Sequence, residues 1–181
     1  MADVVLRRLA LEDQEALVAL SGRNRAFLSG LMPIGDEKND EDRGQWVLDL
    51  LAELEAGTKW FGVIEYDAAL VGALSFRLDR GLSRSANIGY WVSEEVNGRG
   101  VATEAVRQAL HLIFNEFGLH RVDAFIRPDN LGSRRVLEKN GFREVGLSRG
   151  HLHIGGRWWD MTYLQVLAPW DDGVRWGPAQ S

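Results

Sequence analysis

The segment with the clearest chemical content is a turn built from Asn97, Gly98, Arg99 and Gly100, which leads directly into a helical pattern. Because Gly98 and Gly100 have no Cβ, the turn can adopt backbone angles closed to other residues and lets a ligand approach the main chain. The free N–H groups that begin a helix attract anions, and the Arg99 guanidinium can pair with the same phosphate. The turn therefore predicts a phosphate or pyrophosphate site.

A second polar group follows the next apolar run, where residues 127–133 read Arg-Pro-Asp-Asn-Leu-Gly-Ser. Asn130 and Ser133 stand at the start of another short helical pattern, and either side chain can cap that helix. If Asn130 provides the cap, the Ser133 hydroxyl is left for contact with a ligand. Both roles remain open for Ser133.

Taken in order, these residues resemble the GNAT superfamily of N-acetyltransferases. The run from Asn97 to Ala102 is similar to its acetyl-CoA pyrophosphate loop, Gln/Arg-x-x-Gly-x-Gly/Ala. Tyr90-Trp91-Val92 before it, and Asn130-x-x-Ser133 with Glu138-Lys139-Asn140-Gly141-Phe142 after it, resemble the Rim-type (RimJ/RimL-like) branch. Members of that branch acetylate ribosomal-protein N-termini or small amines. The resemblance covers nearly the whole chain and departs at Asn97, where Gln or Arg is usual; this loses a side-chain contact but leaves the N–H groups in place.

The resemblance implies that acetyl-CoA (coenzyme A) is the cofactor, and that its acetyl group moves to a primary amine by direct attack on the thioester. It places the pyrophosphate over the glycine turn, the pantetheine along residues 91–93 and the sulfur end near residues 130–133. The residues expected to bind the cofactor are Trp91, Val92, Ser93, Asn97, Gly98, Arg99, Gly100, Val101, Ala102, Thr103, Asn130 and Ser133.

Attack of an amine on a thioester needs a donor for the oxyanion and an acid for the departing thiolate. A main-chain N–H of Trp91 or Val92 is the expected oxyanion donor, because a bulged strand leaves such groups unpaired. Many GNAT members supply the acid from a tyrosine four residues before a Gly-Phe pair, and that position holds Leu137 here. The resemblance to the Rim-type branch implies that Ser133 is the catalytic acid instead.

The proton acceptor is the least determined group. The acidic residue that the family often carries on its fourth strand falls near Asn87, which cannot accept a proton. Asp160 is the leading catalytic candidate, although a solvated surface role is commoner for such a residue. The other candidates, each able to act through a water, are Glu144, His120, His151 and His153.

The resemblance places the acceptor wall in the segment that contains Phe27 and Met32, and Asn87 and Trp158 are further substrate candidates. Phe27, Met32 and Trp158 also fit ordinary core positions. The acceptor can be a small-molecule amine or a basic protein N-terminus. The missing tyrosine and the missing acidic residue support an alternative hypothesis, a catalytically silent acyl-CoA-binding module that senses the cofactor.

Composition sets outer limits on function. The 181 residues contain no cysteine, which excludes disulfides, thiolate metal sites and cysteine nucleophiles, and we expect no bound metal. A formal net charge of −5 argues against direct nucleic-acid binding and mildly favours cationic partners. With no signal peptide and no apolar run long enough for a membrane span, we expect a cytoplasmic protein without membrane contact. A monomer and a homodimer are both compatible with the sequence.

The elements that must hold these residues follow from hydrophobic periodicity. Helical patterns occupy residues 12–20, about 40–55, 102–117 and about 130–140, and strand patterns occupy residues 4–9, 59–66, 70–78, 83–93, 120–127, a run from 142 and 158–167. The resemblance implies an α+β GNAT fold in a single domain, residues 1–181. Its mostly antiparallel sheet of about seven strands is splayed between strands four and five and flanked by about four helices. Gly89 is expected to mark a bulge in the fourth strand, and residues 168–181 an irregular tail.

Overall fold

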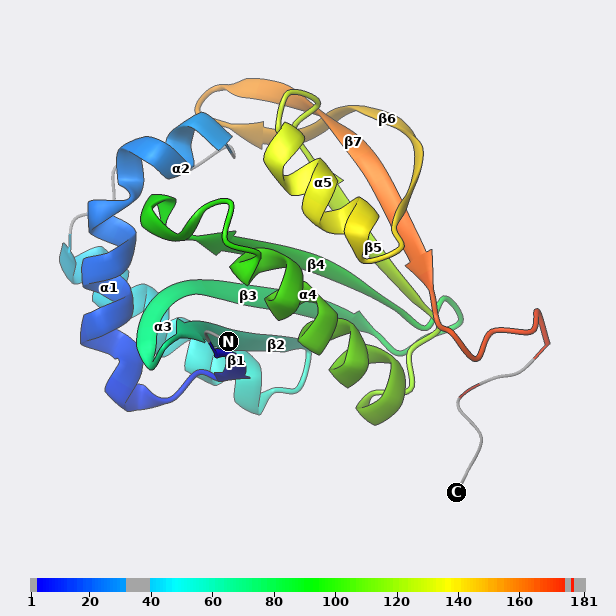
Figure 1. Cartoon of the computed structure of the whole chain (residues 1–181), viewed down its shortest axis with the longest axis horizontal. Coiled ribbons are helices and arrows are strands. Elements are labelled where there is room, and N and C mark those ends of the chain that lie inside the picture. The colour runs from blue at the N-terminus through cyan, green and yellow to red at the C-terminus, as the bar shows by residue number, and fades with distance from the viewer. Residues whose placement is uncertain (1–2, 32–39, 175–176, 178–181) are drawn as a thin grey trace.

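A computed structural model describes residues 3–31, 40–174 and 177, with the backbone alone for Leu31 and residues 40–47. Met32, one of the expected substrate residues, lies outside the described residues. The described chain forms one seven-stranded sheet with helices on both faces (Figure 1). None of its described helices is both long enough and apolar enough to cross a bilayer.

The sheet has the strand order β1-β2-β3-β4-β5-β7-β6. Its strands are β1 (Val4–Arg8), β2 (Lys59–Tyr66), β3 (Ala69–Asp79), β4 (Ser85–Val92), β5 (Arg121–Ile126), β6 (Arg143–Ile154) and β7 (Arg157–Leu167). Neighbouring strands are antiparallel except β4 and β5, which run parallel. The expected α+β fold with a mostly antiparallel sheet of seven strands is confirmed.

The parallel pair is short and opens toward the carboxyl ends of its two strands. Pairing ends at Ile88↔Ala124, whereas β4 continues to Val92 and β5 to Ile126. The expected splay between the fourth and fifth strands is therefore confirmed, and Gly89 is the first residue of β4 beyond the ladder. Main-chain groups past this point need partners other than the neighbouring strand.

Gly89 itself is not a bulge, contrary to the expectation from the sequence. The β3–β4 register runs through it without a shift, and Ser75 stands opposite. The irregularity lies one strand further away, between Ile64 and Glu65 of β2, where the register of β3 skips Val71. Gly89 marks the position where β4 loses its parallel partner, and a Cβ built there meets no atom within 4 Å. The absent side chain leaves open space beside the strand.

Five α-helices lie on the described part of the chain: α1 (Gln14–Arg23), α2 (Arg25–Leu31), α3 (Asp40–Glu55), α4 (Val101–His111) and α5 (Leu131–Lys139). The chain continues from α4 through a wider π-helical turn, Leu112–Glu116. The helix beyond the expected four is α2, because Asn24 leaves helical angles (φ −92°, ψ 5°) and separates it from α1. The buried Asn24 side chain accepts hydrogen bonds from Ser93 Oγ (3.1 Å) and Glu94 N–H (3.0 Å), which ties the helix junction to the end of β4.

Side chains on each strand alternate between two packed clusters, one on each face of the sheet. Leu17 of α1 and Leu50 of α3 share a cluster with Val63 of β2. The next residue of that strand, Ile64, belongs to the other cluster, together with Val106 of α4. In Figure 1, α4 and α5 lie in front of the sheet, over β2–β4 and β5 respectively. The splay between β4 and β5 therefore opens beside both of these helices.

Candidate active site

The glycine turn begins α4 and leaves the predicted anion site open. Gly98 and Gly100 both have left-handed angles (φ 75° and 83°), and Gly100 is the N-cap of α4. A Cβ built on either glycine meets no atom within 4 Å, so the backbone angle, and not crowding, requires glycine here. The turn lines a cavity of about 220 Å³, in which Val101 and Thr103 also take part. The predicted anion site is therefore an accessible hollow at a helix N-terminus.

Two cations from α5 line the same hollow, and the sequence interpretation missed them. Arg135 and Lys139 are four residues apart, which places them on one side of α5. That spacing is the signal that could have found them. Arg99, the cation predicted for this purpose, is exposed and does not belong to the lining of the 220 Å³ cavity. An anion here would meet the N–H groups of α4 and the two α5 cations.

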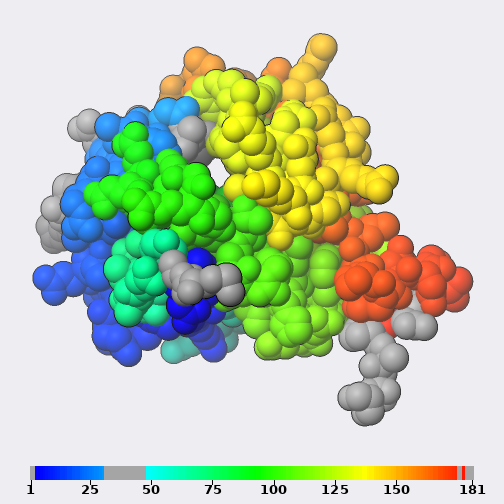
Figure 2. All heavy atoms as spheres, in the orientation of Figure 1, coloured from blue at the N-terminus to red at the C-terminus, as the bar shows by residue number. Residues whose placement is uncertain are grey.

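A cleft of about 460 Å³ continues from the turn between β4, α2 and α5. Of the predicted cofactor-binding residues, it brings together Trp91, Val92, Asn97, Gly98, Ala102, Asn130 and Ser133, while Gly100, Val101 and Thr103 line the adjoining 220 Å³ cavity. Ser93 is left out, because its buried hydroxyl donates to Asn24. Figure 2 shows the surface hollowed between α2 in blue, the green segment after β4, and α5 in yellow.

A second cavity, of about 430 Å³, lies in the splay between β4 and β5 and is called the splay cavity below. Tyr90, Trp91, Asn130 and Ser133 line both this cavity and the cleft. Most of its remaining wall is apolar and includes the fully buried Leu137, the position of the usual GNAT tyrosine. Among the residues that the structure describes, Lys59 and Arg127 are the charged members of its lining. The cleft and the splay cavity thus meet at four shared residues.

The directions of the β4 main-chain groups follow from the β3–β4 ladder. Ser93 N–H donates to Val71 O at 2.6 Å, and N–H groups alternate in direction along a strand, so odd-numbered residues of β4 direct theirs toward β3. Tyr90 and Val92 then direct their N–H groups toward β5, which has left the ladder at this point. Of the two predicted oxyanion donors, Val92 faces the splay and Trp91 faces β3.

Two residues of the site hold Ser133 in position. Asn130 Oδ1 accepts the Ser133 N–H at 3.0 Å, which makes Asn130 the N-cap of α5. Tyr90 Oη lies 2.9 Å from Ser133 Oγ and 3.3 Å from Ser133 O. Burial raises the pKa of the Tyr90 phenol above its ordinary range, and the hydrogen bond with Ser133 opposes part of that rise. Asn130 is therefore the cap, and the Ser133 hydroxyl meets Tyr90, a contact that no sequence spacing could reveal.

One of the predicted proton acceptors, His151, lies against the wall of the splay cavity. Its ring stacks on Phe125, which lines the cavity, with ring centroids 4.0 Å apart and an interplanar angle of 19°. Its Nδ1 lies 3.0 Å from Ser148 Oγ, and the tautomer decides which of these two atoms donates. When Nδ1 carries the proton, Nε2 is left as an acceptor.

The structure does not bring Asp160 to the lining of the cleft or the splay cavity. Asp160 Oδ1 accepts the Gly150 N–H at 2.8 Å. Because Met161 lines the splay cavity and successive side chains on a strand alternate, Asp160 is directed to the other face of β7. The remaining candidates are engaged elsewhere: Glu144 pairs with Arg134, His120 pairs with Asp171, and His153 packs on Trp158.

The predicted substrate residues are dispersed. Phe27 lines the cleft and not the splay cavity. Asn87 is exposed on β4, where it pairs with Asp123 of β5. Trp158 is 65 % exposed on β7 and is therefore not a core residue, and neither it nor Asn87 lines the cleft or the splay cavity.

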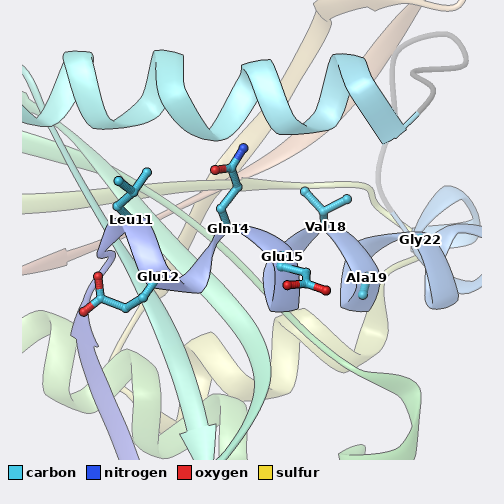
Figure 3. A pocket seen from close by; sticks show the side chains of 7 residues that line it. All are labelled: Leu11, Glu12, Gln14, Glu15, Val18, Ala19 and Gly22. Atoms are coloured by element: carbon cyan, nitrogen blue, oxygen red, sulfur yellow. The ribbon is translucent and has the colours of Figure 1, made fainter.

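A further hollow of about 580 Å³ lies along the N-terminal segment, where Leu11, Gln14 and Val18 point toward a neighbouring helix (Figure 3). Its described lining comes from a single segment and consists of Leu11, Glu12, Gln14, Glu15, Val18, Ala19 and Gly22. Among the residues that the structure describes, it contains no predicted site residue and shares no lining residue with the cleft or the splay cavity. The candidate site is therefore the junction of the cleft and the splay cavity, beside the splay between β4 and β5.

The chain is similar to known proteins in both sequence and fold. Residues 3–143 match the family model described as an acetyltransferase (GNAT) domain. The chain is 35% identical to probable N-acetyltransferase YjcK of Bacillus subtilis, over 93% of this chain and 96% of that protein. It is 27% identical to the [ribosomal protein uS5]-alanine N-acetyltransferase of Escherichia coli, over 94% and 91%. The solved structure of Mycobacterium smegmatis RimJ in complex with CoA-disulfide has a TM-score of 0.85 and 33% identity, covering 91% of this chain and 82% of that one.

Proposed function

The chain belongs to the GNAT family of acetyltransferases, and on that premise we propose that it transfers the acetyl group of acetyl-CoA to the α-amine at the N-terminus of a protein. The observation that carries the proposal is the junction at Tyr90, Trp91, Asn130 and Ser133. These residues line both the cleft that leads to the glycine turn and the splay cavity. A transfer between two bound molecules needs its reacting groups held side by side.

When it is bound, acetyl-CoA supplies an activated acetyl thioester. The residues present fit its anionic end, because the glycine turn leaves open space in front of the α4 N-terminus and Arg135 and Lys139 line the same hollow. The α4 N–H groups and these cations would hold the phosphates. Trp91 and Asn130 would hold the pantetheine arm along the cleft.

Main-chain and hydroxyl groups at the junction have the required chemistry. The N–H of Val92 is directed into the splay and would stabilise the developing oxyanion. Ser133 would pass its hydroxyl proton to the departing sulfur, which replaces the tyrosine missing at Leu137. Lys59 and Arg127 also line the splay cavity, and each is paired with a carboxylate, Glu53 and Asp129 respectively, which offsets its positive charge.

His151 is the proton acceptor that we propose, acting through water. It stacks on Phe125 at the wall of the splay cavity, and Ser148 fixes its Nδ1. A histidine suits this task at neutral pH, because its neutral imidazole accepts a proton through a ring nitrogen. Asp160 is not used in this mechanism, since its carboxylate binds the Gly150 amide.

A protein N-terminus is favoured as acceptor by the relatives. The E. coli relative is named for an alanine N-acetyltransferase activity on ribosomal protein uS5, and its similarity spans 94% of this chain. We place the first residue of the acceptor polypeptide in the splay cavity, where Phe125 brings His151 to the wall. A ribosomal-protein acceptor would place the reaction in the cytoplasm.

The test is release of free thiol from acetyl-CoA in the presence of three acceptor sets. These are peptides with a free α-amine, the same peptides with a blocked N-terminus and an internal lysine, and a panel of small amines. We expect release with the first set, and a product whose mass spectrum places one acetyl group on the α-amine.

Two outcomes would overturn the proposal. Turnover with small amines alone would assign another acceptor class. Calorimetric binding of acetyl-CoA without turnover on any amine would instead support the silent sensor module.

A further inference from the structure

Of the four described residues that line both the cleft and the splay cavity, Tyr90 is the one with a titratable side chain. We propose that Tyr90 is a positioning residue, whose phenol turns the Ser133 hydroxyl proton toward the sulfur of the bound acyl donor. The inference rests on the proposed function, because it specifies how Ser133 delivers its proton.

The phenol reaches Ser133 across the splay. Tyr90 belongs to β4 and Ser133 to the first turn of α5, 43 residues later in the chain. Tyr90 Oη is 2.9 Å from Ser133 Oγ and 3.3 Å from Ser133 O, and Asn130 already binds the Ser133 N–H at 3.0 Å. Asn130 therefore holds the Ser133 backbone in place, and Tyr90 contacts the Ser133 hydroxyl and can set the direction of its proton.

Tyr90 has one phenolic proton, so it can donate a good hydrogen bond either to the Ser133 carbonyl oxygen or to Ser133 Oγ, but not to both. If Tyr90 donates to the Ser133 carbonyl, the Ser133 proton must fill the 2.9 Å contact and turns away from the cleft. If Tyr90 donates to Ser133 Oγ, the Ser133 proton is free to enter the cleft. A separation of 2.9 Å is normal for an O–H···O bond and 3.3 Å is long, which favours donation to Oγ. Burial raises the pKa of the phenol, so Tyr90 keeps the proton it donates at neutral pH.

This arrangement accounts for every proton in the transfer. When the carbon–sulfur bond breaks, its electron pair goes to sulfur, and Ser133 Oγ gives its proton to that sulfur. Tyr90 keeps its phenolic proton and donates it in a hydrogen bond to the Ser133 oxygen, which then takes a proton from water. The attacking nitrogen loses one proton to water, so the number of protons in the solvent is unchanged.

The test compares four variants of the whole chain with the wild type. Tyr90→Phe keeps the buried ring and removes the hydroxyl, and Ser133→Ala removes the acid. The double variant Tyr90→Phe/Ser133→Ala shows whether the two groups act together. Tyr66→Phe is the matched control, because Tyr66 is another partly buried tyrosine of the sheet and lies outside both cavities. Thermal unfolding confirms that each variant is folded.

We expect Tyr90→Phe to lower kcat about 10- to 100-fold and to leave KM for acetyl-CoA within about twofold, because the lost contact aids only proton delivery. The double variant should be no slower than Ser133→Ala, and Tyr66→Phe should match the wild type. Losses that multiply in the double variant would overturn the inference, since independent contributions add in free energy. So would a Tyr90→Phe effect confined to KM. A wild-type chain without turnover on any acceptor would overturn the proposed function instead.

Discussion

Asn130 Oδ1 accepts the Ser133 N–H at 3.0 Å, and this bond closes the first turn of α5 at the junction of the two cavities. Asn130→Ala should lower the free energy of unfolding by about 1 kcal/mol, as loss of an N-cap does. It should also raise KM for acetyl-CoA about tenfold, through a lost hydrogen bond to the pantetheine arm. Urea denaturation and steady-state kinetics measure the two effects.

Asn130→Asp separates these effects. It keeps an oxygen acceptor for the Ser133 N–H and adds a favourable negative charge at a helix N-terminus, so stability should return to the wild-type level. The amide donor is still absent, and KM should stay raised. A normal KM in either variant would show that Asn130 caps α5 without touching the donor.

Gly100→Glu should abolish acetyl-CoA binding while the chain stays folded. The left-handed angle at Gly100 costs a non-glycine residue about 1 to 2 kcal/mol, and the new carboxylate would stand where phosphate binds. Gly57→Glu is the matched control, because Gly57 is also left-handed (φ 70°) with open space at its Cβ position, but it follows α3. Calorimetry should show loss of affinity in Gly100→Glu alone. Equal affinities in the two variants would contradict the assignment of the glycine turn.

Gly89→Leu should obstruct binding of the acceptor peptide and leave binding of acetyl-CoA unchanged. Gly89 lines the splay cavity but not the cleft, and a Cβ there meets no atom within 4 Å, so a side chain can enter the cavity. We expect KM for an acceptor peptide to rise at least about tenfold, which corresponds to about 1.4 kcal/mol of lost binding. The acetyl-CoA Kd should change by less than about twofold on the same scale. Gly89→Ala should give a smaller shift in the same direction, and a loss of acetyl-CoA affinity in either variant would reverse the assignment of the two cavities.

His151→Gln should lower kcat about 10- to 100-fold if His151 accepts the amine proton. His153→Gln is the matched control, since His153 is two residues away on the same strand and packs on the exposed Trp158. It should behave like the wild type. Single-turnover kinetics compare the two variants at saturating acetyl-CoA, and equal rates would remove His151 from the mechanism.

Local patterns, together with the resemblance to the GNAT family, predicted which residues would form the donor half of the site, and that assignment stays a prediction. The glycine turn, the helix after it and the Asn130/Ser133 pair are each set by a few adjacent residues, and the structure brings most of them to the cleft. The contact between Tyr90 and Ser133 depends on how β4 and α5 meet across the splay, which no spacing in the sequence encodes. For Asp160, strand alternation shows that it faces away from Met161, but only the fold shows that Met161 is the one directed into the splay cavity.

The Gly89 prediction failed for a related reason. Glycine in a strand is typical of a bulge, but here the β3–β4 ladder passes through Gly89 without a shift. What changes at Gly89 is the pairing with β5, a strand that begins more than 30 residues later. The sequence therefore identified Gly89 as the residue where the sheet changes, but it predicted a bulge where the structure has the end of the β4–β5 pairing.

Asp13 should make part of the stability depend on pH. Its carboxylate accepts two hydrogen bonds from Arg7, both 2.7 Å, and one from the Ala10 N–H at 2.9 Å. The bonds from Arg7 hold the pKa of Asp13 below its ordinary value, although burial opposes this. A lowered folded-state pKa gives stability that is present above the unfolded pKa and is lost as pH falls through the folded pKa.

Asp13→Asn should therefore lower the free energy of unfolding at pH 7, by about 1 to 2 kcal/mol, since water screens the Arg7 side chain, which is 38% exposed. The difference from the wild type should shrink below about pH 4, where the unfolded-state carboxylate gains its proton. Urea titrations at neutral and acidic pH provide the comparison. A difference that stays constant with pH would show that the loss is steric and not electrostatic.

The early end of the β4–β5 ladder also couples ligand binding to folding. Tyr90 and Val92 direct N–H groups into the splay, where β5 no longer pairs with them. A pantetheine arm carries amide groups that can take the place of the missing strand. By mass action, a ligand at about one hundred times its Kd adds about 2.7 kcal/mol to the stability of a protein, a large share of the total of about 5 to 15 kcal/mol typical of a domain. We therefore expect the folded population of this enzyme, and with it its resistance to proteolysis, to rise and fall with the supply of its own acyl donor.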